Sequence, residues 1–130
     1  MPPATPCARA PALYIVDTDA AVRDGLSRLV KSAGFEPKPC NNAEAFVQQV
    51  ADSNAACALL DLSDIGLDDP VVRARLRILA TLLPVVALSV RDDANTERTA
   101  RELGAQAFFR KPVDAAALLD AIRWVMAENK

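Results

Sequence analysis

The chain has 130 residues, of which 52% are apolar and 25% charged, and its formal net charge at pH 7 is −2. These values describe one globular domain with enough apolar residues to fold alone. The slight negative charge gives no footprint for nucleic acid or an anionic membrane. The sequence has no histidine, which excludes imidazole metal ligands and Ser-His or Cys-His catalysis, and its three cysteines do not suit a disulfide framework.

The first eleven residues, MPPATPCARAP, differ in composition from the rest. They lack the basic segment and apolar run of a secretory signal. No run of 18 apolar residues marks a membrane span. We therefore expect residues 1–11 to form a disordered tail and residues 12–130 to form one cytoplasmic domain.

Strand and helix patterns then alternate five times. Apolar or extended segments predict strands at residues 13–16, 35–40, 56–60, 84–88 and 107–109. Helical spacing of apolar residues, with capping residues and Pro or Gly at the ends, predicts helices at 22–33, 42–50, 70–82, 95–103 and after 114. The alternation is typical of a flavodoxin-like (βα)5 three-layer sandwich with a parallel five-stranded sheet in the order 2-1-3-4-5. Two prolines place the second strand at the sheet edge.

Two surface features follow from the helical spacing. Trp124 falls opposite the apolar stripe of the last helix, so we expect it to be exposed. It marks either a partner contact or packing against a neighbouring segment. Arg73 and Arg77 share one helix face and Arg75 does not, which favours a solvated face over a DNA-binding stripe.

Polar residues follow four of the five strands. Asp17 and Asp19 follow the first strand, Asp61 the third, Ser89 the fourth and Lys111 the fifth. Because the carboxyl ends of parallel strands meet at one edge of a sheet, we expect these side chains to gather there. The alternative for Asp19 is a helix N-terminal acid that complements the dipole.

These residue types suit phosphoryl transfer onto an aspartate. Converging carboxylates repel each other unless a cation lies between them, and an all-oxygen site suits Mg²⁺. An aspartate neutralised in this way can attack a phosphoryl group, whose charge a lysine and a serine hydroxyl would balance. A cofactor-binding enzyme would instead need a Gly-rich phosphate loop, which residues 17–21 do not provide.

The motifs at these strand ends resemble the receiver domain of bacterial two-component response regulators. The resemblance extends from Leu13 to Met126, and among receivers it is strongest to those of nitrogen-fixation-regulator-type transcription factors. It rests on the segments Tyr14–Asp19, Leu60–Leu62, Ala87–Ser89 and Lys111–Pro112, with support from residues 42–46 and 103–109.

The resemblance implies a phosphoacceptor signalling domain rather than an enzyme. Asp61 matches the phosphoacceptor. The implied Mg²⁺ ligands are Asp17, Asp61 and the backbone carbonyl of Ser63, and Asp19 or Asp64 is a further candidate.

The resemblance also implies the residues that respond to the phosphoryl group. Ser89 and Lys111 match the hydroxyl and the lysine that bind it, and Phe108 matches the aromatic side chain that changes rotamer with the hydroxyl. On local evidence alone, Phe108 is a packing residue. The expected phosphoryl source is a sensor histidine kinase or a phosphotransfer protein. The expected output is a downstream protein, or a homodimer of this chain, bound through the face of the fourth helix, fifth strand and fifth helix.

Three departures from the family pattern surround Asp61. Thr18 stands where the family has a second acid, and Asp19 is one position too late on an extended segment. After Asp61 the family has a Met-Pro pair and then a Gly, whereas this chain has Asp64-Ile65 and then Asp69. Val90 replaces a small residue and is expected to narrow the pocket.

Three interpretations therefore stay open. The chain is a phosphoaccepting receiver, a degenerate receiver that acts as a phosphorylation-independent interaction module, or the receiver fragment of a DNA-binding transcription factor. The third requires a further DNA-binding domain.

Overall fold

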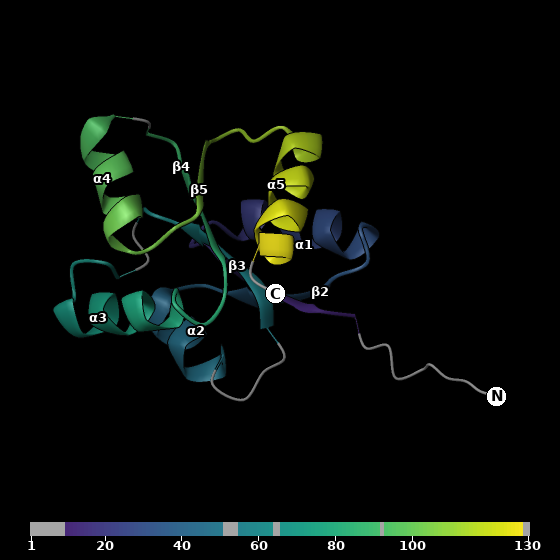
Figure 1. The fold of residues 1–130 in the computed structure, drawn as a ribbon. Coiled ribbons are helices and arrows are strands. Elements are labelled where there is room, and N and C mark those ends of the chain that lie inside the picture. Colours follow the sequence, from purple (N-terminus) through teal and green to yellow (C-terminus); the bar gives the residue numbers. More distant parts are fainter. Residues whose placement is uncertain (1–9, 51–54, 64–65, 92, 129–130) are drawn as a thin grey trace.

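The computed structural model describes residues 10–50, 55–63, 66–91 and 93–128, and its five strands alternate with five helices (Figure 1). The strands are β1 (Ala12–Val16), β2 (Glu36–Cys40), β3 (Ala55–Asp61), β4 (Val85–Ser89) and β5 (Ala107–Arg110). The helices are α1 (Ala20–Ser32), α2 (Ala43–Val50), α3 (Pro70–Leu79), α4 (Ala94–Glu102) and α5 (Ala115–Glu128).

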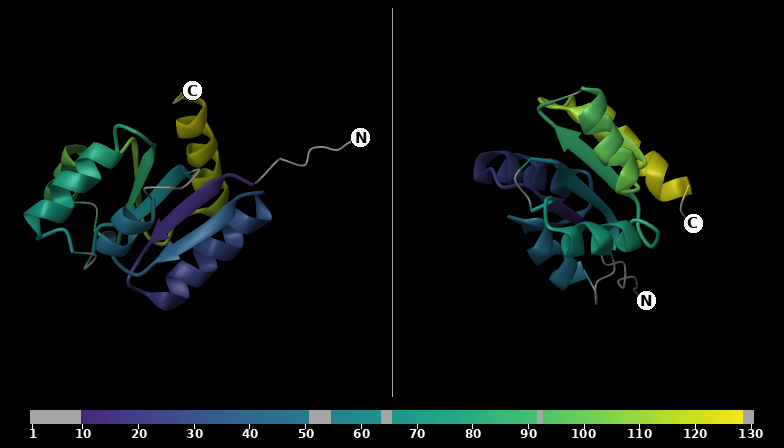
Figure 2. Two further views of the ribbon diagram at one scale, coloured as in Figure 1. Left: turned by 90° about the horizontal axis from the view of Figure 1, so that it is seen from below. Right: turned by 90° about the vertical axis from the view of Figure 1, so that its left-hand side faces the viewer.

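All strand pairs are parallel and the sheet order is β2-β1-β3-β4-β5, which confirms the predicted flavodoxin-like topology. Helices lie on both sides of the sheet (Figure 2). One apolar cluster includes residues of α1 and α5, and the other includes residues of α2 and α3. The sheet is therefore covered on both faces, which is why its central strands are continuous apolar runs.

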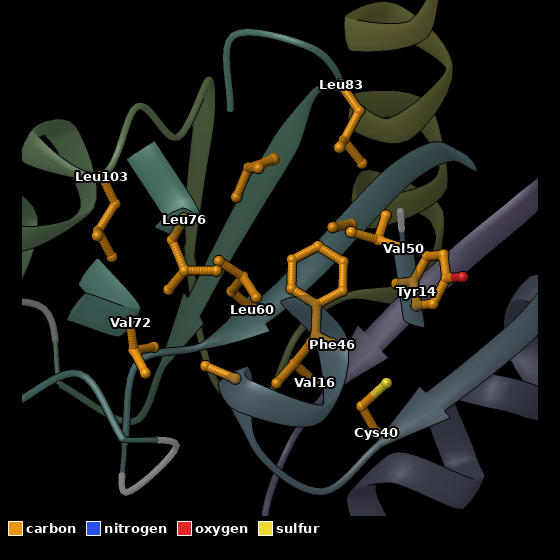
Figure 3. Packing of buried hydrophobic residues seen from close by; sticks show 13 residues of the cluster. Tyr14, Val16, Cys40, Phe46, Val50, Leu60, Val72, Leu76, Leu83 and Leu103 are labelled. Atoms are coloured by element: carbon orange, nitrogen blue, oxygen red, sulfur yellow. The ribbon is translucent and has the colours of Figure 1, made fainter. Parts of the chain in front are cut away.

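Alternation along β1 divides its side chains between the two clusters. Leu13 and Ile15 belong to the cluster on the α1 and α5 side, and Tyr14 and Val16 to the cluster on the α2 and α3 side. Figure 3 shows the second cluster, in which the rings of Tyr14 and Phe46 meet edge to face, with centroids 5.3 Å apart. Edge-to-face contact is a preferred geometry for aromatic pairs.

Side-chain caps begin the helices where the sequence predicts them. Asn42 Oδ1 accepts from Ala45 N at 2.7 Å, Asp69 Oδ1 from Val71 N at 2.9 Å, and Asp114 Oδ2 from Ala117 N at 2.9 Å. Each bond satisfies one of the backbone donors that a helix leaves free at its first turn. The local sequence therefore sets these starts.

One predicted helix end is wrong. The sequence pattern extends the third helix to about Leu82, whereas α3 ends at Leu79. Thr81 N donates to Ile78 O at 3.0 Å and Leu82 N donates to Leu79 O at 2.8 Å, which are i to i−3 bonds. The chain thus tightens into turns before Pro84, consistent with the bias against helix before a proline.

The edge strand β2 agrees with the local rule for proline. Both prolines of β2 lie on the edge strand, where fewer ladder donors are needed. Residues 1–9 of the predicted tail lie outside the described residues, but the carbonyl of Pro11 accepts from Glu36 N at 2.9 Å. Among the described residues, no helix is long and apolar enough to cross a membrane.

Candidate functional site

The carboxyl ends of the strands bring together polar residues that are far apart in sequence. Asp17 directly follows β1, Asp61 ends β3, Ser89 ends β4 and Lys111 directly follows β5. Asp17, Asp61 and Ser89 are 1%, 5% and 2% exposed, so the site is buried. Buried charges persist when they are paired and hydrogen-bonded.

Lys111 joins the two carboxylates. Its Nζ donates to Asp17 Oδ2 at 2.6 Å and to Asp61 Oδ2 at 2.9 Å. The other carboxylate oxygens accept backbone donors: Asp17 Oδ1 from Asp19 N at 2.9 Å, and Asp61 Oδ1 from Ser63 N at 3.1 Å. The cluster therefore holds two carboxylates for one ammonium, and its formal charge is −1.

Burial and the neighbouring charges shift two of these groups. Burial raises the pKa of Asp61, the hydrogen bonds from Lys111 and Ser63 oppose that rise, and the charge of Asp17 adds to it, so the pKa is raised overall. Burial by itself lowers the pKa of Lys111, but the hydrogen bonds and charges of Asp17 and Asp61 outweigh it and raise that pKa. Lys111 is therefore cationic, whereas the surroundings of Asp61 disfavour its ionised form.

Ser89 faces a cavity next to this cluster. Its Oγ accepts from Arg91 N at 3.0 Å, so the hydroxyl closes a local turn. The same residue lines a cavity of about 510 Å³ together with Ser63, Val90 and Thr96. Polar groups from the ends of β3 and β4 thus border a space beside the phosphoacceptor candidate.

The family can now be identified from the comparisons with known proteins. The family model of the response regulator receiver domain matches residues 13–123. This chain belongs to the response regulator receiver domain family. It is therefore a receiver domain of the two-component systems, which is a signalling domain.

Curated relatives and solved structures agree with this family. The response regulator protein TodT of Pseudomonas putida is 34% identical over 88% of this chain and 51% of its own length. The transcriptional regulatory protein FixJ of Bradyrhizobium diazoefficiens is 30% identical over 78% of this chain and 50% of its own length. The structure of the response regulator StyR matches with a TM-score of 0.78 and 30% identity, over 93% of this chain and 61% of that one.

A receiver domain of an HD domain-containing protein from Pseudomonas fluorescens matches with a TM-score of 0.82 and 20% identity, over 93% of this chain and 98% of that one. At that identity the match supports the fold alone. The receiver described here spans about half the length of the curated relatives named above.

The residues that depart from the receiver pattern do not join the carboxylate cluster. Thr18 is exposed. Asp19 is also exposed and caps α1, because its Oδ1 accepts from Ala21 N at 2.9 Å and from Val22 N at 3.3 Å. Its side chain thus fills the helix-start role that the sequence offered as the alternative to metal binding.

The remaining residues that the sequence singled out differ in position and exposure. Asp64 lies outside the described residues. Val90 is 59% exposed and lines the cavity beside Ser89. Phe108 is half-buried on β5, while its neighbour Phe109 packs against the core on the α1 and α5 side. Trp124 is 58% exposed, as predicted.

The carboxylates that remain could hold a largely hydrated magnesium ion. No group of three or more acidic, cysteine or histidine side chains converges within the described parts of the chain. Mg²⁺ in proteins commonly keeps several waters and uses one or two carboxylates. Asp17 and Asp61 supply these two, and their excess charge over Lys111 favours a second cation.

One contact at this site was missed by sequence reasoning. The guanidinium of Arg23 donates to the backbone carbonyl of Asp17 at 2.7 Å, and so fixes the segment between β1 and α1. Arg23 is the fourth residue of α1 and belongs to no motif that the sequence offered. The contact depends on the path of the loop rather than on a motif.

Proposed function

We propose that this receiver domain accepts a phosphoryl group on Asp61 from a sensor histidine kinase or a phosphotransfer protein, with Mg²⁺. The observation that carries the proposal is the placement of Lys111 Nζ within hydrogen-bonding distance of both Asp61 and Asp17. A lone strand-end acid needs no such arrangement. These donors act in the cytoplasm, where we place the protein.

The chemical step uses Asp61 as an oxygen nucleophile. A carboxylate oxygen forms a bond to phosphorus while the bond from phosphorus to the donor imidazole nitrogen breaks, and the ring leaves as neutral imidazole because its other nitrogen already carries a proton. Lys111 then donates to a phosphoryl oxygen in place of the carboxylate oxygen that it now binds, while it keeps its bond to Asp17. Ser89 supplies a hydroxyl donor from the end of β4.

Magnesium would be held by the Asp17 and Asp61 carboxylates and by the backbone carbonyl of Ser63. When bound, it supplies positive charge that offsets the repulsion between the nucleophile and the incoming phosphoryl oxygens. Asp64 remains a candidate ligand. Asp19 is a weaker one, because its side chain caps α1.

We propose that the signal leaves through the face of α4, β5 and α5. Ser89 and Phe108 lie on the adjacent strands β4 and β5, so a reoriented hydroxyl and a rotated ring repack this face together. A downstream protein or a second copy of this chain would read the change. Binding of these partners through this face therefore depends on the proposed phosphorylation of Asp61.

The deciding experiment is incubation with acetyl phosphate or phosphoramidate and Mg²⁺, followed by intact mass measurement. We expect one phosphoryl adduct on the wild-type chain and none on Asp61→Asn. Circular dichroism on the same samples establishes that both are folded. A folded wild-type chain that gains no phosphoryl mass refutes the proposal.

A second experiment tests the metal site at its altered position. Thr18→Asp restores an acid beside Asp17 and should tighten Mg²⁺ binding, because a further carboxylate adds charge to the site. Titration of Mg²⁺ by calorimetry measures the change, with Thr18→Asn as the neutral control. Unchanged affinity in Thr18→Asp would count against a metal ion at this position.

The phosphorylation-independent module is the second candidate, and two observations favour it. Lys111 already balances part of the carboxylate charge, and Thr18 is exposed and does not supply the second acid of the family. That function predicts partner binding that is the same for the wild-type chain and Asp61→Asn. Since this receiver spans only half of its curated relatives, placement in a longer DNA-binding regulator is a further proposal.

A further inference from the structure

Helix α3 has an apolar stripe on its outer side that the fold does not use. Val71, Ile78 and Leu82 are 59%, 62% and 75% exposed. They account for most of the large hydrophobic side chains found exposed in the described residues, the others being Val90 and Trp124. Figure 1 shows α3 at the periphery of the molecule.

The stripe is distinct from the side of α3 that packs on the sheet. Val72 and Leu76 are buried and point into the cluster around Leu60 (Figure 3). At 3.6 residues per turn, Val71 and Ile78 fall on one line along the opposite side. Leu82 lies beyond the end of α3, in the turn where its amide donates to Leu79 O at 2.8 Å. From Val71 to Ile78 the stripe is about 10 Å long, at 1.5 Å of rise per residue.

Basic side chains flank this stripe. Helix α3 carries Arg73, Arg75 and Arg77 and has no acidic residue between Pro70 and Leu79. Arg73 contacts Glu102 at 3.4 Å, whereas Arg75 and Arg77 are exposed and form no ion pair with any described residue. The acid nearest to the helix in sequence, Asp69, caps its first turn.

A groove lies beside α3, on the side of the helix that faces α4. It has a volume of about 570 Å³, lies between α3 and α4, and is lined by Arg73, Arg77, Glu102 and Leu103. Arg73 and Arg77 are one turn apart and border it together. Besides the exposed stripe, α3 therefore offers the guanidinium groups of Arg75 and Arg77, neither of which forms an ion pair with a described residue.

We propose that the outer face of α3 and of the turn after it, formed by Val71, Arg75, Arg77, Ile78 and Leu82, docks an acidic amphipathic helix of a partner protein. Leucine-type side chains of the partner cover the stripe, and its flanking glutamates or aspartates pair with Arg75 and Arg77. A second copy of this chain fits poorly, because a two-fold contact would place the arginines of one α3 against those of the other. The face is separate from the carboxylate cluster, so docking does not depend on phosphorylation of Asp61.

The test uses a fluorescein-labelled peptide of about 15 residues, which is long enough to form a helix. Its leucines follow helical spacing and glutamates flank them. We expect fluorescence anisotropy to show binding to the wild-type chain that weakens as salt concentration rises. Ile78→Ser and Leu82→Ser should each weaken binding by about tenfold, the effect of truncating an anchor residue. Arg75→Glu should weaken it and reduce its salt dependence.

Matched controls distinguish binding at this face from non-specific hydrophobic binding. Trp124→Ser removes an exposed hydrophobic residue on α5 and should leave peptide binding unchanged. A peptide with lysine in place of each glutamate should bind at least tenfold more weakly, because its charge is repelled by Arg75 and Arg77. A tenfold change in the dissociation constant corresponds to about 1.4 kcal/mol of binding free energy. Circular dichroism checks that the α3 variants keep their fold, which their surface positions favour.

Three outcomes would overturn the proposal. They are the absence of peptide binding, equal binding of the lysine peptide, and binding that Ile78→Ser and Arg75→Glu leave unchanged. Sedimentation velocity gives the last check. If the wild-type chain self-associates and Ile78→Ser abolishes this, the face belongs to a second copy and the acidic partner is refuted.

Discussion

The interior of the sheet and its carboxyl edge are both buried, but they are stabilised in different ways. In the interior, apolar side chains such as Phe46 and Ile15 gain by leaving water and by filling space. At the edge, Asp17 and Asp61 share the ammonium of Lys111, so the cluster of these three side chains carries a net negative charge. Truncation should therefore always destabilise the interior, whereas at the edge the sign should depend on which charge is removed.

Phe46→Ala tests the interior and should have the largest effect. Phe46 is fully buried and its ring contacts Tyr14 edge to face. The free energy of unfolding should fall by about 3–5 kcal/mol, because apolar burial is lost and a cavity remains. Urea unfolding measures it, with Phe46→Leu as the control that keeps most of the volume and costs less. An effect below that of Phe46→Leu would contradict a close-packed interior.

Lys111→Met should have the next largest effect and lower the free energy of unfolding by about 3 kcal/mol. The methionine keeps a similar side-chain length, but Asp17 and Asp61 then lie buried together without a cation. Because the pKa of Lys111 is raised, its stabilising contribution is complete below 10.5 and is lost only as pH rises beyond that value. Urea unfolding at neutral pH checks the result against Lys111→Arg, which keeps the charge. Equal stability of Lys111→Met and wild type would show that the two acids do not repel.

Asp61→Asn should act in the opposite direction and stabilise the fold by about 1 kcal/mol. The amide removes one buried negative charge, keeps an oxygen for the Ser63 amide, and leaves Lys111 paired with Asp17. Thermal unfolding provides the measurement. Asp120→Asn is the matched control, because that side chain is 82% exposed and its change should be small. A destabilised Asp61→Asn would mean that the edge is charge-balanced like an ordinary ion pair.

The advantage of Asp61→Asn should also depend on pH. The pKa of Asp61 is raised above its ordinary value of 3.8, so the folded state binds the proton more tightly than the unfolded state does. The cost of ionised Asp61 is therefore complete above the folded pKa and disappears as pH falls through it towards 3.8. Measured across the acid range, the difference in free energy of unfolding between Asp61→Asn and the wild-type chain should shrink as pH falls. If that difference widens as pH falls, the pKa of Asp61 is lowered in the folded state rather than raised.

Gly25→Ala should have the smallest effect, a gain of about 0.5–1 kcal/mol. Gly25 lies inside α1, and a Cβ at this position would meet no atom within 4 Å. Alanine therefore adds helix propensity without crowding. Thermal unfolding checks the gain, with Gly104→Ala as the contrasting control, where φ is +88° and a Cβ would lie 2.8 Å from Ala80 Cβ. A loss of stability in Gly25→Ala would indicate a packing role for the glycine.

The sequence was most informative where structure depends on neighbours in the chain. The caps at Asn42, Asp69 and Asp114 form within the next few residues, so the helix starts could be predicted. The end of α3 could not, because apolar spacing continues to Leu82 while the backbone bonds change to the i−3 type. The role of Asp19 also required the loop path, which decided between capping α1 and facing Asp17.

By itself, the sequence determined the parallel sheet, its strand order and the strand ends at which Asp17, Asp61, Ser89 and Lys111 stand, because periodicity and chain connectivity leave few arrangements. Only the tertiary structure decided what these residues do to one another. Asp17 and Lys111 are 94 residues apart in the chain and 2.6 Å apart in the fold. Burial, and the number of carboxylates that one ammonium must serve, are properties of that packed edge, and no local pattern encodes them.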